Sequence, residues 1–113
     1  MGELKYLTSE EKNALDLLIN KLRTKLVDQI VKIQLFGSKS RGDFTNDSDI
    51  DLLLVVRERT TGILDTIAEI SLDVDLRYDP NISLIVFSLD EYNQNAAWET
   101  PFIKNIEKEG ILL

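Results

Sequence analysis

The chain has 113 residues and a formal net charge of −7, with 43% hydrophobic and 29% charged residues, and this composition predicts one globular domain over 1–113. It contains no cysteine and no histidine, which excludes disulfides, thiolate metal sites, serine–histidine triads and imidazole bases. Any acid–base or metal chemistry must therefore use carboxylates, whose oxygens favour hard cations such as Mg²⁺ or Mn²⁺.

Charge and hydropathy also bear on location and partners. No apolar stretch approaches the roughly 20 residues that span a bilayer, and the N-terminal segment MGELKYLTSEEK is too polar and acidic for a signal peptide. We therefore expect a cytoplasmic protein that does not contact a membrane. The negative charge repels polyanions, so nucleic-acid binding by this chain alone is disfavoured.

The first predicted element is an amphipathic helix over roughly 9–27. Thr8 and Glu11 have the spacing of a capping box at its start. Its apolar face consists of residues at helical spacing, namely Leu15, Leu18, Ile19, Leu22 and Leu26. Two strands follow, at 30–36 and 50–56. The second strand, IDLLLVV, is apolar on both faces, as expected of a central strand covered on both sides.

The second half of the chain continues the alternation of helices and strands. A helix is predicted at about 62–77, then a turn at 79–81 and a third strand at 82–87. A capping box at 88–91 predicts a short helix, and a Thr-Pro start predicts a last helix within 100–110. The order α-β-β-α-β-α-α predicts an α+β (α/β mixed) fold, a small mixed sheet with helices packed on it.

The stretch LFGSKSRGDFTNDSDIDLLLVV holds the candidate metal ligands. Residues i and i+2 of a strand point to the same side, so Asp49 and Asp51 should project together from the start of the second strand. Two carboxylates this close repel unless they are protonated or bridged by a cation. We therefore expect the pair to bind a divalent metal, which can hold a triphosphate and stabilise a leaving pyrophosphate.

The same stretch contains candidate phosphate-binding groups, directly after the first strand. Gly37 allows close approach of the backbone to a phosphate, and the residues from Ser38 onward offer amide N–H groups. A short helix starting near Ser38 would add to this anion site. The Arg41 guanidinium can bind phosphate through its fork, whereas Lys39 is left open between phosphate binding and a surface position. Together with the acid pair, these groups describe a site for a nucleoside triphosphate.

The segment GSKSRGDFTNDSDIDLLLV resembles the signature of the nucleotidyltransferase superfamily, which has the polymerase-beta-like fold. Length and element order resemble the minimal nucleotidyltransferases of bacteria and archaea. The resemblance implies transfer of a nucleoside monophosphate, by default AMP from ATP, to an acceptor hydroxyl with release of pyrophosphate. It implies catalytic metal ligands at Asp49 and Asp51 and nucleotide-binding residues at Gly37, Ser38, Arg41 and Ser48.

One departure from the family pattern leaves catalysis open. The family's third carboxylate usually sits on a later strand, but the third strand here, ISLIVFS, has no acid and Ser83 occupies the corresponding position. Its loss could slow the reaction, leave the role to a partner or substrate, or abolish activity. The alternative function is a catalytically weak or inactive module that acts as binding or antitoxin partner of a helical HEPN-type protein. Self-association of the chain is also left open.

The acidic residues also have two simpler interpretations. An Asp-x-Asp pair before a strand is often only a solvated strand entry. Asp47, Asp49, Asp51 and Glu58 match positions of an EF-hand calcium loop, but Leu52 stands where that loop needs glycine. The apolar run that follows would also have to be buried as a strand, so the calcium-loop interpretation is disfavoured.

Overall fold

The computed structural model describes residues 6–42 and 49–113 of the chain. The elements follow the order α1 (Ser9–Lys25), β1 (Ile30–Phe36), α2 (Ser38–Arg41), β2 (Ile50–Val56), α3 (Thr61–Tyr78), β3 (Ile82–Ser88), α4 (Leu89–Ala97), α5 (Pro101–Glu109) and β4 (Ile111–Leu112). This confirms the predicted mixed α and β fold.

The four strands of the described part form one mixed sheet in the order β3-β2-β1-β4. β1 pairs antiparallel with both β2 and β4, whereas β2 and β3 run parallel. β2 is therefore a central strand, and its residues 52–56 are all buried. The register places Asp51 of β2 beside Phe36 of β1 and Ser83 of β3.

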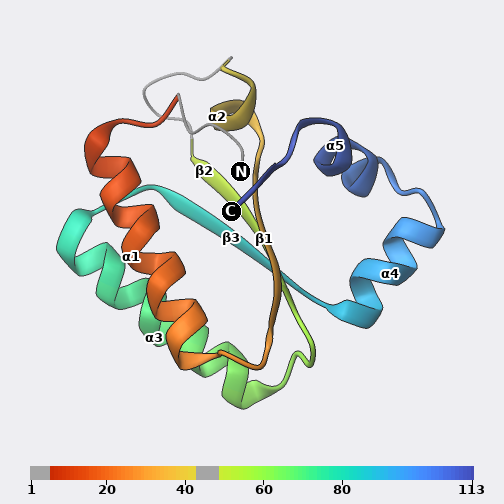
Figure 1. The fold of residues 1–113 in the computed structure, drawn as a ribbon, viewed down its shortest axis with the longest axis horizontal. Helices are drawn as coiled ribbons and strands as arrows, with labels where there is room; N and C mark the ends of the chain where they lie inside the picture. Colours follow the sequence, from red (N-terminus) through yellow and green to blue (C-terminus); the bar gives the residue numbers. More distant parts are fainter. Residues whose placement is uncertain (1–5, 43–48) are drawn as a thin grey trace.

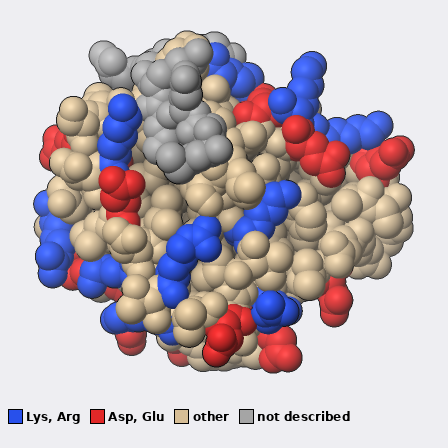
Figure 2. Space-filling model, in the orientation of Figure 1, with Lys and Arg blue, Asp and Glu red and all other residues tan. Residues whose placement is uncertain are grey.

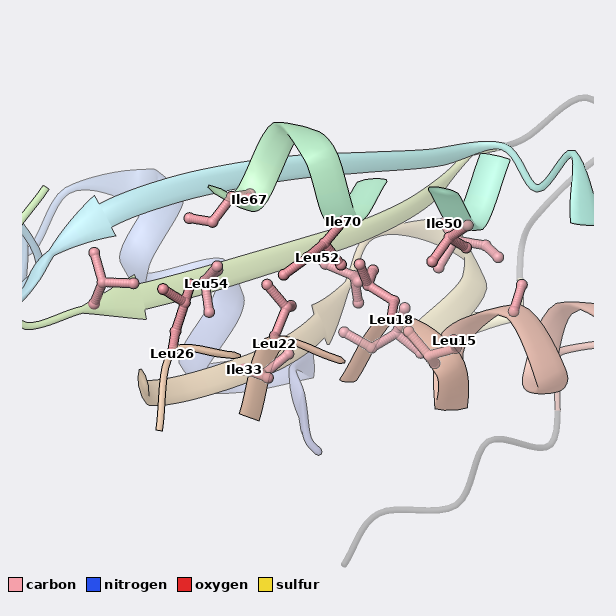
Figure 3. Packing of buried hydrophobic residues seen from close by; sticks show 14 of the residues in the cluster. Leu15, Leu18, Leu22, Leu26, Ile33, Ile50, Leu52, Leu54, Ile67 and Ile70 are labelled. Carbon is pink, nitrogen blue, oxygen red and sulfur yellow. The ribbon is translucent and has the colours of Figure 1, made fainter. Parts of the chain in front are cut away.

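One face of the sheet is covered by α1 and α3 (Figure 1). Alternate residues of β2 pack into this layer, and Figure 3 shows their side chains pointing toward those of the two helices. The buried residues labelled there are Leu15, Leu18, Leu22 and Leu26 of the α1 segment, Ile33, Ile50, Leu52, Leu54, Ile67 and Ile70. The predicted leucine face of the first helix is thus part of the main core.

The opposite face of the sheet is covered by α4 and α5 (Figure 1). Leu53 and Val55 of β2 pack here with Ile106 of α5, and the Phe102 ring makes edge contacts with the rings of Phe36 and Phe87 at 5.5 and 5.8 Å. Burial on both faces explains why β2 reads as a continuous apolar run. By strand alternation, Asp51 lies on this second face, on the side of α5.

The predicted strands 30–36 and 50–56 coincide with β1 and β2, and the ends predicted for α1, α3 and β3 lie within two residues of the observed ones. The C-terminal strand β4 was not predicted, because two residues are too few to show a period. It is held by pairing with β1 and by a hydrogen bond from the Leu113 N–H to the Ile33 carbonyl oxygen, 2.9 Å. Within the described ranges, every helix is too short or too polar to traverse a lipid bilayer.

Candidate functional site

The two acidic residues lie where β2 begins. Asp51 is the second residue of the strand, and Asp49 is exposed directly before it. The Ile50 side chain between them is buried on the opposite face with α1 and α3, and its N–H donates to the Asn81 carbonyl oxygen at 2.7 Å. This bond fixes the start of β2 to the start of β3 and so fixes the backbone that carries both acids.

The environment of Asp51 disfavours its ionised form. Burial raises the pKa of the Asp51 carboxyl, the neighbouring Asp49 charge raises it further, and the Arg41 guanidinium acts in the opposite direction. The two carboxylates are therefore close enough to repel each other. The interpretation of the two acids as residues of a solvated strand start agrees with the exposed Asp49. It does not agree with Asp51, which is partly buried.

Gly37 lies directly against the Asp51 carboxylate. Its φ of +78° is a left-handed conformation that L side chains rarely adopt, and a Cβ added there would lie 2.3 Å from Asp51 Oδ2. The Gly37 carbonyl oxygen accepts from the backbone N–H groups of Ser40 and Arg41 at 3.0 and 3.3 Å, which starts the short helix α2. The backbone bend at Gly37 therefore lies against Asp51, and Figure 1 shows α2 near the start of β2.

Arg41 acts electrostatically on Asp51 and contacts the end of α5. Its Nη1 is 2.9 Å from Oε1 and 3.0 Å from Oε2 of Glu109, the last residue of α5. Oε1 of Glu109 also accepts from the Gly37 backbone N–H at 3.3 Å. The Glu109 carboxylate thus contacts both Gly37 and Arg41, two residues that the sequence predicted to bind phosphate.

Sequence reasoning did not identify Glu109, which is 68 residues away from Arg41 in the chain. The available signal was weak: an acidic residue at a helix C-terminus, where the helix dipole favours cations. Only the packing of α5 against the sheet brings it to the glycine bend.

Lys39 is not the surface cation that the sequence left open. It is 6% exposed, and its Nζ lies 3.2 Å from Oε2 of Glu11. Glu11 also closes the capping box with Thr8 that starts α1. This ion pair ties the glycine bend and α2 to α1, so Lys39 has a structural role in positioning the site.

The remaining predicted site residues are less fully described. Ser38 begins α2, but its side chain lies outside the described atoms, and Ser48 lies outside the described residues. Ser83 is paired with Asp51 across β2 and β3. Its correspondence to the family's third acid stays a prediction. The EF-hand interpretation is wrong, because 50–56 form β2.

The acid pair fits a hard divalent cation in its donor chemistry, since both groups offer carboxylate oxygens and repel each other without a bridging charge. No cluster of three or more acidic side chains suited to a metal occurs in 6–42 and 49–113. This is compatible with Mg²⁺, which proteins often bind through one or two carboxylates together with substrate phosphates.

Comparison with known proteins identifies the family of this chain and agrees with its fold. The model of the nucleotidyltransferase domain matches residues 15–113. A Methanocaldococcus jannaschii protein named "Putative protein adenylyltransferase MJ0604" is 35% identical over 91% of this chain and 97% of its own. The crystal structure of "a putative nucleotidyltransferase from Sulfolobus solfataricus" superposes with a TM-score of 0.57 at 21% identity, over 99% of this chain and 89% of that one. A mutant of the toxin–antitoxin complex MntA–HpeT gives 0.55 at 21% identity, over 88% and 70%. The chain therefore belongs to the nucleotidyltransferase domain family.

Proposed function

We propose that this protein is a metal-dependent nucleotidyltransferase that transfers AMP from ATP to an acceptor hydroxyl. The observation that carries the proposal is the position of Gly37, whose backbone borders the Asp51 carboxylate without any intervening side chain. A triphosphate in this space would meet both a metal-binding acid pair and phosphate-binding donors. Family membership supports the transferase chemistry.

Each residue has a separate role in this scheme. Asp49 and Asp51 would hold Mg²⁺ or Mn²⁺, which when bound neutralises charge on the triphosphate and the leaving pyrophosphate. Gly37 offers its backbone N–H to a phosphate oxygen, and Arg41 offers its guanidinium. Ser38 and Ser48 are retained as nucleotide-binding residues.

The proposed reaction is a substitution at the α-phosphorus. The acceptor oxygen forms a bond to this phosphorus, the bond to the bridging oxygen of the β-phosphate breaks, and pyrophosphate leaves with the electron pair. The acceptor proton passes to water or to a base on the acceptor, since Ser83 offers no carboxylate beside Asp51. Positioning and charge stabilisation supply most of the catalysis in such phosphoryl transfers.

A protein is the acceptor that we favour. The relative named a protein adenylyltransferase supports this choice. So does the net charge of −7, which opposes the approach of RNA. Figure 2 shows acidic and basic side chains interspersed over the face drawn, without one continuous basic band for a nucleic-acid backbone. We place the reaction in the cytoplasm.

A second candidate is a weakly active or inactive module that binds a helical HEPN-type protein as an antitoxin does. Ser83 favours it, because the strand position paired with Asp51 lacks an acid. The fold similarity to the MntA–HpeT toxin–antitoxin complex is compatible with such a partner. Efficient turnover of nucleotide by the purified chain alone would remove the reason for this candidate.

The deciding experiment compares labelled AMP transfer by the wild type, Asp49→Asn and Asp51→Asn, with Mg²⁺ or Mn²⁺ and with EDTA. We expect either substitution to reduce transfer at least about a hundredfold, because removing an electrostatic contact to the transition state has effects of this size. Asp65→Asn, an exposed position on α3, is the matched control and should keep wild-type activity. Transfer that survives both substitutions would exclude the proposed site.

A further inference from the structure

The carboxylate of Glu109 contacts the Gly37 N–H and the Arg41 guanidinium, the two donors that a phosphate would need. It accepts from the Gly37 N–H at 3.3 Å and makes a charge-assisted contact of 2.9 Å with the Arg41 guanidinium. A phosphate oxygen and a carboxylate oxygen seek the same donors, and both carry negative charge. Glu109 therefore resembles a bound phosphate in its contacts, although it belongs to the protein.

Helix stability does not account for an acid at this position. Glu109 is the last residue of α5, where the helix dipole presents its negative end and disfavours a carboxylate. Its side chain is only 19% exposed, so it has also lost much of its hydration. The Gly37 N–H and Arg41 compensate for both effects, which makes the contact specific rather than incidental.

We propose that Glu109 is an internal competitor for the triphosphate, holding the Gly37 amide and Arg41 until a nucleotide displaces it. The proposal rests on the function proposed above, since it takes these two groups as phosphate ligands. A phosphate cannot use the Gly37 N–H while Glu109 does, so binding requires the Glu109 carboxylate to leave.

Such a competitor lowers the apparent affinity for nucleotide. Only the fraction of molecules in which Glu109 has left the two donors can bind the phosphate, and the apparent affinity falls in proportion to that fraction. In the nucleotide-free protein the Arg41 guanidinium also offsets part of the charge of Asp51. Glu109 thereby sets the concentration range of triphosphate over which the site fills.

The test measures binding of inorganic tripolyphosphate in EDTA by calorimetry, which isolates the anion donors from any metal. We expect Glu109→Gln to bind about three- to tenfold more tightly than the wild type, because one ion pair and one charge-assisted hydrogen bond no longer compete. Glu107→Gln removes the same charge from an exposed position on α5 and should stay within about twofold of wild type. Circular dichroism checks that both variants are folded.

A second readout follows the Gly37 amide by NMR. Its resonance should shift in Glu109→Gln without ligand, and again in the wild type when tripolyphosphate is added, while the distant Gly62 amide stays in place. Unchanged or weaker binding by Glu109→Gln, with a wild type that does bind, overturns the competitor role and leaves the proposed function intact. Absence of tripolyphosphate and ATP–Mg²⁺ binding in every variant overturns the proposed function, and this inference falls with it.

Discussion

Among single residues, Gly37 is the one at which backbone geometry and chemistry constrain each other most. A Cβ there would meet Asp51 Oδ2 at 2.3 Å, and the φ of +78° is unfavourable for any L side chain. We expect Gly37→Ala to lower the free energy of unfolding by about 1–2 kcal/mol from the backbone conformation alone and to weaken ATP binding strongly. Urea denaturation and calorimetry measure the two effects.

Gly62→Ala is the matched control for this substitution. A Cβ at Gly62, in the first turn of α3, meets nothing within 4 Å, so alanine should stabilise the protein by about 0.5–1 kcal/mol and leave ATP binding unchanged. If Gly37→Ala were as well tolerated as Gly62→Ala, the contact between the glycine bend and Asp51 would not constrain the site.

Some residues of the candidate site could be predicted from the sequence, whereas others could not. Gly37, Asp49 and Asp51 lie within fifteen positions, so their spacing and strand alternation alone suggested a common site. Glu109 joins them only through tertiary packing, and no local pattern encodes that contact. Lys39 was ambiguous for a similar reason, because its ion-pair partner Glu11 lies on a different helix.

At the scale of elements, the ion pair between Glu11 and Lys39 links α1 to α2. Burial by itself would raise the pKa of the Glu11 carboxyl, but hydrogen bonds from the Thr8 backbone N–H and from Lys39 outweigh it and hold the pKa below the ordinary value of 4.5. A carboxyl whose pKa is lowered on folding adds stability above pH 4.5, and this contribution is lost as the pH falls through the folded-state pKa.

Glu11→Gln tests this link. We expect it to reduce the free energy of unfolding at pH 7 by about 0.5–1 kcal/mol, the size of a cap contact and a partly exposed ion pair. The difference from the wild type should shrink as the pH falls below 4.5, because the wild type then loses the same interaction. Chemical denaturation over a pH series measures this difference in the free energy of unfolding, and Glu10→Gln at an exposed position is the control. A difference that does not change with pH would show that the effect comes from side-chain packing and not from the charge of Glu11.

The elements themselves were largely predictable, since their apolar periods match their burial. The leucine spacing of α1 and the doubly apolar β2 each reflect the layers that cover them. Strand order was not accessible from these periods. The pairing of β4 with β1 depends on where α5 ends, and the parallel pairing of β2 with β3 depends on the crossover through α3.

At the scale of the whole molecule, the net charge of −7 limits what can approach the site. RNA and this chain repel each other over about a Debye length, roughly 10 Å at 0.1 M salt. A protein acceptor can present a locally basic or neutral surface, so it avoids most of that penalty. The net charge of the protein thus favours a protein acceptor over RNA, although the charged groups need not contact the reacting atoms.

This separation gives a final prediction about the product of the reaction. When the protein is supplied with labelled ATP, Mg²⁺ and a cell extract, we expect the transferred label to be removed by protease and to resist ribonuclease. The Asp51→Asn variant supplies the background. Label that ribonuclease removes, in an amount that rises with salt as repulsion is screened, would instead identify RNA as the acceptor. Because the readout is the chemical nature of the labelled product, it separates acceptor choice from the question of whether the site is active.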